Sequence, residues 1–162
     1  MLIHTPSSLK INKTFLFPLF LLFTLGIFLT QDGTAEALCV KDKKAYLRSG
    51  PGKHNDKLWT VLKYYPFRQI GREGGWLKVK DLDGHVFWIY RKLTTKAYMC
   101  AVIKKDKTNL RQGPGTNFPK VEWSPIEKYF SMKVLEIRGS WVHIIDSEGD
   151  KAWVHRTLVW VQ

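Results

Sequence analysis

The stretch Leu47-Arg48-Ser49-Gly50-Pro51-Gly52 returns 63 positions later as Leu110-Arg111-Gln112-Gly113-Pro114-Gly115. Tryptophans and turn residues follow both copies in the same order, and the offset between matched residues grows to 65. The matched pairs are Trp59 with Trp123, Trp76 with Trp141, Asp81 with Asp146, Gly84 with Gly149, Trp88 with Trp153, Arg91 with Arg156 and Leu93 with Leu158. An internal repeat of this length marks a structural unit. The chain is therefore predicted to contain two copies of one small domain.

Within each copy the local signals favour β-structure alone. In the first copy, runs rich in Val, Ile and aromatic residues predict strands at Leu58–Leu62, Phe67–Arg72, Trp76–Lys80 and His85–Tyr90. Asp81-Leu82-Asp83-Gly84 and Asp146-Ser147-Glu148-Gly149 predict tight hairpin turns, in which glycine supplies a positive φ. Five short strands in about 60 residues are too few for an immunoglobulin-type sandwich. We therefore expect an all-β chain with two tandem small five-stranded barrels.

Residue alternation assigns the two faces of one strand in each copy. Leu77 and Val79, like Val142 and Ile144, are predicted to face the core. Trp76 and Trp141 then face the other way, beside Lys78 and His143 respectively. Two interpretations stay open. An outward indole beside a basic residue is typical of a binding surface, and it is also found packed beneath a neighbouring loop.

The first 37 residues have the features of an export signal. Lys10 and Lys13 precede an apolar run from Phe15 to Thr30, and Ala35-Glu36-Ala37 has the pattern of a cleavage site. The run has 16 residues, fewer than the ~20 that a membrane-spanning helix needs. We expect a signal helix at 1–37 that is removed; the alternative is an uncleaved anchor. The mature chain is expected to be periplasmic or secreted.

The charge of the chain favours anionic partners. Its formal net charge is +12, and removal of residues 1–37 leaves that value unchanged, with 24 basic and 12 acidic side chains. Such a surface attracts polyanions. Outside the cytoplasm these are cell-wall carboxylates, lipid phosphates and acidic proteins, and no nucleic acid is expected. The alternative is that the basic surface serves only solubility.

Cys39 and Cys100 are the only cysteines, and an exported chain favours one disulfide between them. Their positions, before the first strand of the first copy and after its last, suggest a bridge that closes the first barrel. A loop of about 60 residues closed in this way stabilises a domain by about 4 kcal/mol in the chain-entropy model. Two separate buried thiols are the alternative.

The order of these motifs, LR-x-GPG, G-x-W or G-G-W, D-x-(D/E)-G and W-(I/V)-x-R-x-L, resembles the bacterial Src homology 3-type (SH3-like) domain family in its tandem, exported form. The resemblance covers the mature chain twice and implies SH3-like domains at 38–95 and 98–162. It also implies a five-stranded barrel in each domain, with a groove beside the long loop after the first strand. Trp76 and Trp141 match a groove tryptophan of the eukaryotic relatives, and Trp88 and Trp153 match another groove aromatic. The first copy departs from the pattern where Tyr90 replaces a histidine.

Neither copy contains a recognisable constellation for catalysis. The histidines and cysteines lack the spacing of a zinc site, and no nucleophile elbow or phosphate-binding glycine loop is present. We expect no enzyme activity, no metal and no cofactor. His155, Arg156 and the equivalent Arg91 lie beside tryptophans, where an arginine either grips a ligand carboxylate or bonds a carboxylate of its own barrel. Arg48 and Arg111 have the same two interpretations, since a strand-end arginine also holds a long loop in place.

The resemblance and the charge together predict a non-catalytic binding module for an anionic cell-wall (peptidoglycan) peptide or an envelope protein. The candidate ligand-binding residues are Trp76, Trp88, Arg91, Trp141, Trp153, His155 and Arg156. Two alternatives differ in class. The first is a structural adaptor in an envelope protein assembly, and the second is a basic surface that binds anionic lipid. Contact with a membrane is otherwise expected only through an uncleaved signal.

Overall fold

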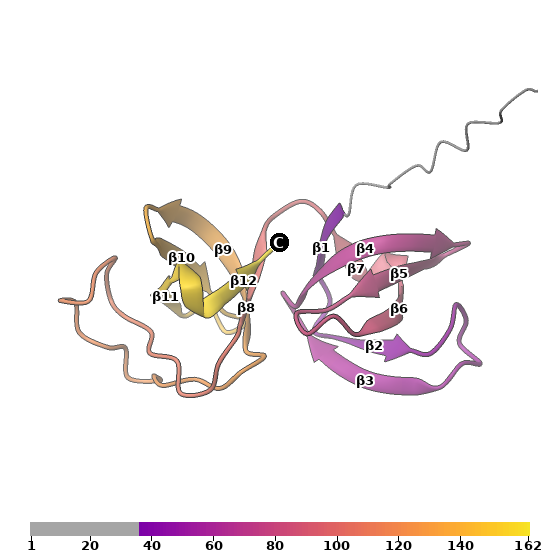
Figure 1. Cartoon of the computed structure of the whole chain (residues 1–162), viewed down its shortest axis with the longest axis horizontal. Coiled ribbons are helices and arrows are strands. Elements are labelled where there is room, and N and C mark those ends of the chain that lie inside the picture. Colours follow the sequence, from indigo (N-terminus) through magenta and orange to yellow (C-terminus); the bar gives the residue numbers. More distant parts are fainter. Residues whose placement is uncertain (1–35) are drawn as a thin grey trace, which may run out of the picture. The chain divides into compact units, whose positions relative to one another are not determined.

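The computed structural model of the chain describes residues 36–162, which form two antiparallel β-sheets (Figure 1). The expected signal segment lies outside the described residues except for Glu36 and Ala37, which begin the first strand. Across residues 36–162, no helix has the length and apolar character needed to cross a membrane.

The first sheet has seven strands in the order β3-β2-β6-β5-β4-β1-β7. They are β1 (Glu36–Val40), β2 (Lys44–Arg48), β3 (Lys57–Leu62), β4 (Pro66–Glu73), β5 (Trp76–Lys80), β6 (Val86–Tyr90) and β7 (Thr94–Thr95), with a 3-10 turn, η1 (Arg91–Leu93), before the last. The four strands predicted from sequence are confirmed to within one residue at each end. The sheet has two strands more than the expected five. These are β1, which pairs with β4, and β7, which pairs with β1, and they flank the recurring motifs.

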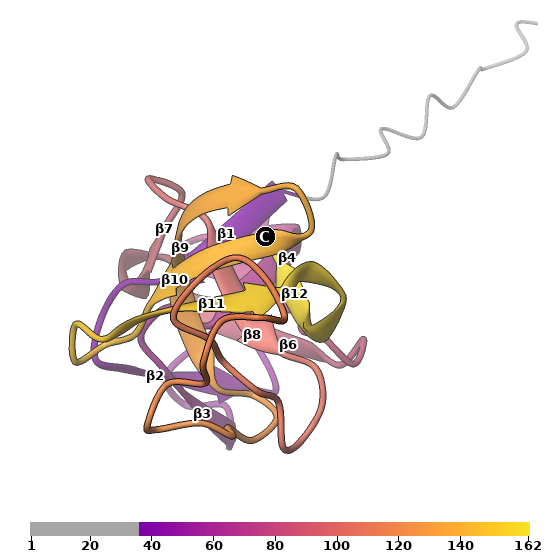
Figure 2. The ribbon, with the colours of Figure 1, turned by 90° about the vertical axis from the view of Figure 1, so that its left-hand side faces the viewer.

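The second sheet has five strands in the order β11-β10-β9-β8-β12 (Figure 2). They are β8 (Cys100–Ile103), β9 (Ser131–Arg138), β10 (Trp141–Ile145), β11 (Lys151–His155) and β12 (Val159–Val161), with η2 (Arg156–Leu158) before the last. The elements from β9 to β12 repeat those from β4 to β7 at an offset of 65 residues. This agreement confirms two tandem domains of one fold.

The two copies differ around the GPG loop. In the first copy β2 and β3 form a continuous ladder, whereas the equivalent segments of the second copy meet only in isolated bridges, Thr108 with Ile126 and Arg111 with Lys120. Pro119 and Pro125 flank these bridges in the second copy. Because proline has no N–H to donate, it interrupts a ladder. Within the described chain, the second sheet therefore lacks counterparts of β2 and β3, and its five strands include β8 and β12.

Each barrel has its own apolar core, as the alternation predicted. Leu77 and Val79 are buried in the first core, and Val142 and Ile144 are buried in the second. The first core consists of Leu38, Val40, Ala45, Leu47, Val61, Tyr65, Phe67, Leu77, Val79, Ile89 and Val102. The second consists of Ala101, Ile103, Leu110, Val121, Ile126, Met132, Val134, Val142, Ile144, Ala152, Val154 and Val159.

The two-stranded ladder of β8 and β12 contributes to both cores. Ala101 and Ile103 belong to the second core, whereas Val102, which lies between them, belongs to the first. On β12, Val159 is buried in the second core and Trp160 packs against the first. Successive side chains of a strand point to opposite faces. This ladder therefore has apolar packing on both faces and joins the barrels.

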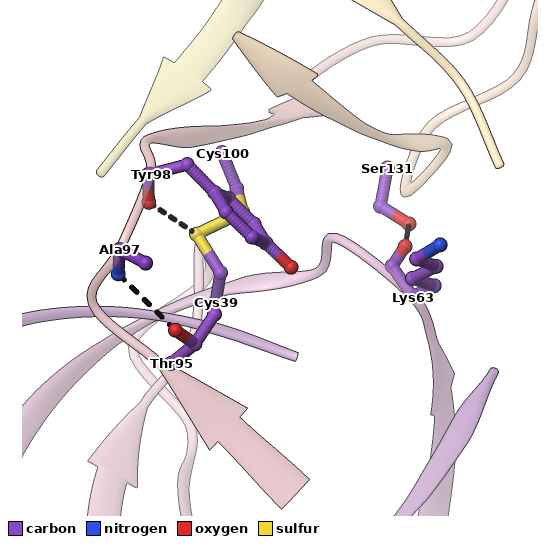
Figure 3. The surroundings of a disulfide bond; sticks show 7 residues. All are labelled: Cys39, Lys63, Thr95, Ala97, Tyr98, Cys100 and Ser131. Atoms are coloured by element: carbon purple, nitrogen blue, oxygen red, sulfur yellow. Dashed lines mark hydrogen bonds between the residues drawn. A yellow bond between two sulfur atoms is a disulfide. The ribbon is translucent and has the colours of Figure 1, made fainter. Parts of the chain in front are cut away.

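A disulfide between Cys39 and Cys100 reinforces this junction, with a Cα–Cα distance of 5.9 Å (Figure 3). The predicted pairing is confirmed, and the alternative of two thiols is excluded. The expectation that the bridge closes the first barrel is wrong. Cys100 begins β8, the first strand of the second sheet, so the bond links β1 of one barrel to β8 of the other.

Polar contacts also cross between the barrels. The Ser131 hydroxyl donates to the Lys63 carbonyl oxygen at 2.8 Å (Figure 3). The Asp83 carboxylate accepts from the Lys128 ammonium at 2.8 Å and from the Tyr129 hydroxyl at 2.7 Å. The hydrogen bond from Lys128, followed by that from Tyr129, holds the pKa of the Asp83 carboxyl below its ordinary value.

Candidate functional site

A groove of about 160 Å³ opens on the first barrel, beside the loop that follows β2. We call it the first groove. Its lining residues are Tyr46, Arg48, Lys53, Trp76, Tyr90 and Leu93. They come from β2, the GPG loop, β5, β6 and η1, so residues far apart in the sequence meet there.

A second groove of about 300 Å³ occupies the equivalent place on the second barrel. Its lining residues are Lys105, Asp106, Lys107, Thr108, Asn109, Arg111, Thr116, Trp141, His155 and Leu158. Six of these match the six residues of the first groove through the repeat. They are Asn109, Arg111, Thr116, Trp141, His155 and Leu158. Both copies therefore build a groove from the same six positions.

The arginine of each groove holds the GPG loop in place, which was one of the two interpretations left open by the sequence. Arg48 donates from Nη1 to the Asn55 carbonyl oxygen at 2.6 Å. Arg111 makes the equivalent bond to the Phe118 carbonyl oxygen at 2.7 Å. A Cβ at Gly50 would lie 2.6 Å from the side chain of Asn55, closer than real Cβ contacts. A side chain at position 50 would therefore displace that of Asn55, because the loop folds tightly back on itself.

The indole of each groove packs against the aromatic ring opposite it. Trp76 pairs in register with Tyr90, and their ring centroids are 5.4 Å apart. Trp141 pairs with His155 at the same distance, in an edge-to-face arrangement. The Arg48 guanidinium lies 5.9 Å from the Trp76 ring centroid. Both indoles keep part of their surface exposed, so a ligand in either groove would meet a flat apolar ring beside a cation.

Buried aspartates stabilise the hairpins that carry these rings. Asp81 Oδ1 accepts from the backbone N–H groups of Asp83 and His85 at 3.0 and 2.8 Å. Asp146 Oδ1 accepts from three N–H groups, each at 2.9 Å. Gly84 and Gly149 follow with φ of 89° and 105°. The predicted hairpin turns are thus confirmed, and they set the register of β5 with β6 and of β10 with β11.

Trp88 and Trp153 lie on the outer face of the same strands but line neither groove. The Lys78 ammonium lies 5.9 Å from the Trp88 ring centroid, on the neighbouring strand. Trp153 is only 7% exposed, and His143 stacks on it with a centroid distance of 4.5 Å. Side chains two residues apart on a strand share a face but lie well separated along it. Tyr90 and His155, two residues further on, are the groove residues.

The remaining candidates divide between the second groove and the open surface. His155 lines the second groove, and its Nδ1 lies 2.8 Å from the Thr157 hydroxyl oxygen. Arg91 lines a different cavity of about 470 Å³, next to Arg72. Arg156 is exposed. Within residues 36–162, neither Arg91 nor Arg156 forms an ion pair with a carboxylate. The interpretation in which each arginine bonds a carboxylate of its own barrel is therefore wrong.

The candidates from the sequence therefore meet only in part. Trp76, Trp141 and His155 lie in grooves, whereas Trp88, Trp153, Arg91 and Arg156 lie outside them. Sequence reasoning did not place Tyr46, Lys53, Tyr90 and Leu93 in a groove. The signal was present in the repeat, since Tyr90 and His155 occupy the same position and Leu93 matches Leu158.

One group of potential metal ligands occurs among the described residues, namely Asp81, Asp83 and His85, whose ligand atoms lie within 4.8 Å of one another. Each carboxylate already has protein partners. Asp81 accepts from hairpin N–H groups, and Asp83 accepts from Lys128 and Tyr129. These bonds account for the cluster as part of a turn and of the junction between the barrels.

Comparisons with solved structures find distant similarity to proteins that contain more than this chain. NlpC2 and NlpC1 from Trichomonas vaginalis are each 11% identical, with TM-scores of 0.35 and 0.34. An NlpC/P60 family protein from Bacillus cereus is 14% identical, with a TM-score of 0.35. Each alignment covers 78% of this chain, and 48%, 45% and 56% of the respective solved chains. The chain thus spans about half the length of these structures. No curated protein matches it.

Comparison with family profiles identifies one family in both halves of the described chain. The profile described as the bacterial SH3 domain matches twice, at residues 41–96 and 104–161. The two matches cover more than half of the chain, and each contains one GPG loop and one groove tryptophan. Two tandem β-barrels, a repeat in register and two profile matches agree, and the chain belongs to the bacterial SH3 domain family.

Proposed function

We propose that this chain is an exported, non-catalytic binding protein whose two grooves bind an anionic peptide of the cell wall. The observation that carries the proposal is the equivalence of the grooves, because six matched positions line a groove in both copies. The proposal includes removal of residues 1–37, a periplasmic or secreted location, and SH3-like domains at 38–95 and 98–162.

The groove chemistry suits a short peptide with a carboxylate. Arg48 uses one N–H group to hold the GPG loop, and a guanidinium has further donors for a ligand carboxylate. Lys53 adds a second cation, and the Trp76 and Tyr90 rings supply apolar contact. A carboxylate held by Arg48 would therefore lie next to a surface that accepts an aliphatic side chain.

The two grooves differ in polarity. Tyr46 and Tyr90 of the first groove are replaced by Asn109 and His155 in the second. The second groove also contains Lys105, Asp106 and Lys107, and Thr116 stands at the position of Lys53, so the lining residues of each groove carry two net positive charges. We infer that both grooves accept an anionic group, and that the first holds the more apolar part of a ligand and the second the more polar part. Two weak sites on one chain gain affinity when both engage one polymer.

Co-sedimentation with isolated cell-wall sacculi tests the proposal. We expect the wild-type chain to pellet with sacculi at 0.1 M salt and to be released near 1 M, where the Debye length falls from about 10 to about 3 Å. The double variant Trp76→Ala/Trp141→Ala should bind at least about tenfold more weakly, since each indole supplies contact area in its groove. Single variants should fall between these two, because one groove remains.

The control is the double variant Lys80→Gln/Lys151→Gln, which removes one exposed positive charge from β5, the strand of Trp76, and one from β11, the strand of His155, without touching either groove. It should retain most of the binding. Sedimentation that falls equally in the lysine and tryptophan variants would make the interaction a general charge effect. Binding to anionic phospholipid vesicles in place of sacculi, or capture of one stoichiometric envelope protein without sacculus binding, would refute the cell-wall ligand.

A further inference from the structure

The outer edge of β3 is free of strand pairing in the part of the chain that the structure describes. β3 lies at one end of the first sheet and pairs only with β2 (Figure 1). Lys63 N–H donates to the Lys43 carbonyl oxygen at 3.2 Å, which makes these residues a hydrogen-bonded pair. Such pairs alternate along an antiparallel ladder. The N–H and C=O groups of Thr60, three residues before Lys63, therefore point away from β2.

A cavity of about 210 Å³ lies along this edge. Five consecutive residues of the chain, 59–63, line one side of it, so it borders the edge of the strand as well as its faces. Tyr129, Phe130 and Ser131 of the second barrel line the other side, and the Trp59 and Tyr129 ring centroids are 5.3 Å apart. Small-molecule sites are larger, at about 300–1,000 Å³. This cavity suits a single apolar side chain.

The exposed face of β3 is apolar. Leu58 is 54% exposed and Leu62 is 63% exposed, and the strand contains no proline. Proteins protect a free edge with proline, charged side chains, a bulge or a covering loop, because an unprotected edge pairs with other strands. β3 has a register shift at Leu58, opposite Leu47 and Arg48, so its regular free edge runs from Trp59 to Leu62. Thr60 and Leu62 share one face, since they alternate with Trp59 and Val61, and the exposed Leu58 lies at the register shift. A strand added here would have apolar contacts on both of its faces.

The charges around the edge indicate which strand it can accept. Lys57 begins β3, Lys63 follows its end, and Lys43 lies opposite Lys63. The acidic Glu148 lines the adjoining cavity, together with Lys43 and Lys63. A second copy paired antiparallel through β3 would bring lysines of both chains together on a molecule that already carries +12. Like charges across a strand pair are destabilising, whereas an acidic strand would be attracted.

We propose that the outer edge of β3 is a docking site for an extended acidic segment of a partner protein. The segment adds to the sheet as an edge strand and bonds the free N–H and C=O groups of Thr60. One of its apolar side chains enters the cavity between Trp59 and Tyr129, and its carboxylates lie near Lys57 and Lys63. Strand addition of this kind takes affinity from main-chain hydrogen bonds and specificity from alternate side-chain pockets. This site is separate from both grooves.

The test uses the purified chain and a fluorescent eight-residue peptide of alternating glutamate and valine, followed by fluorescence anisotropy. We expect saturable binding that weakens at least about tenfold in Thr60→Pro. Proline removes the outward N–H without removing a ladder hydrogen bond, which is why edge strands tolerate it. Leu62→Glu provides a second variant, which places a negative charge at an exposed position on the edge. The same peptide with alternate backbone N-methyl groups should also lose binding.

The variants are compared in the Trp76→Ala/Trp141→Ala background, which removes the indole of both grooves and leaves β3 intact. Acidic-peptide binding that persists in this background and is lost on adding Thr60→Pro belongs to β3, so this site can fail or succeed independently of the proposed function. The proposal is overturned if Thr60→Pro and Leu62→Glu both retain full affinity, or if a lysine and valine peptide binds equally well. Absence of saturable binding at millimolar peptide also overturns it, as does a dimer in sedimentation velocity that Thr60→Pro dissociates.

Discussion

At the scale of single residues, buried aspartates show how a short motif shapes the binding face. Asp146 is 8% exposed, and its Oδ1 accepts from the N–H groups of Glu148, Gly149 and Asp150. A side chain that bonds the backbone a few residues ahead stabilises a turn. Because the turn sets the register of β10 with β11, this carboxylate helps to place Trp141 opposite His155.

We predict that Asp146→Ala lowers the free energy of unfolding by about 2 kcal/mol, because three N–H groups lose a charged acceptor. Asp146→Asn should recover a large part of the loss, since its amide oxygen can accept the same bonds. Urea denaturation followed by tryptophan fluorescence measures both values. Equal stability of the alanine variant and the wild type would show that water replaces the carboxylate at no cost.

At the scale of elements, the ladder of β8 and β12 is the feature that separates this chain from two independent barrels. Val102 and Trp160 pack on the first core, whereas Val159 and Ile103 are buried in the second. A strand buried on both faces reads as a continuous apolar run. Cys100-Ala101-Val102-Ile103 is such a run. Its sequence marks it as buried, but which barrel covers each face depends on the tertiary structure.

We predict that Val102→Ala destabilises the first barrel, although the residue belongs to a strand of the second sheet. Loss of two methyl groups from a fully buried site should cost about 2 kcal/mol. Amide hydrogen exchange should accelerate in β1 and β4. Val159→Ala is the matched control, since it makes the same change on the opposite face of the ladder and should accelerate exchange in β9 and β10 instead. Identical exchange patterns in the two variants would contradict the division of faces.

At the scale of the whole described chain, the disulfide and the polar contacts link the two domains. The Cys39–Cys100 bond links strands 61 residues apart. Asp83, Lys128 and Tyr129 add a second link, and Ser131 with Lys63 adds a third. With the grooves held on one unit, a ligand that spans both does not have to order a flexible linker, which favours avidity.

We predict that Cys39→Ser/Cys100→Ser lowers the free energy of unfolding by up to about 4 kcal/mol, the chain-entropy value for a loop of this length. The barrels should then unfold in two separated transitions, because only the backbone that connects them and the non-covalent contacts remain to couple them. Differential scanning calorimetry distinguishes one transition from two. A single transition with unchanged midpoint would show that packing alone couples the barrels.

Residue patterns alone were enough to predict the two-domain organisation, four strands of the first barrel, both hairpin turns and the core faces of β5 and β10. These features depend on residues close together in the chain or on the repeat. Alternation and turn chemistry act over a few residues, so a single sequence displays them.

Residue patterns could not predict which aromatic residues meet in a groove or which strands the disulfide joins. Trp88 and Trp76 look equivalent in sequence, yet only Trp76 lies in a groove, because the first groove forms where β2, the GPG loop and η1 converge. Cys100 follows the first repeat closely in sequence but begins a strand of the second sheet. Contacts between segments distant in the chain depend on how sheets curve and pack, and local residue patterns do not encode them.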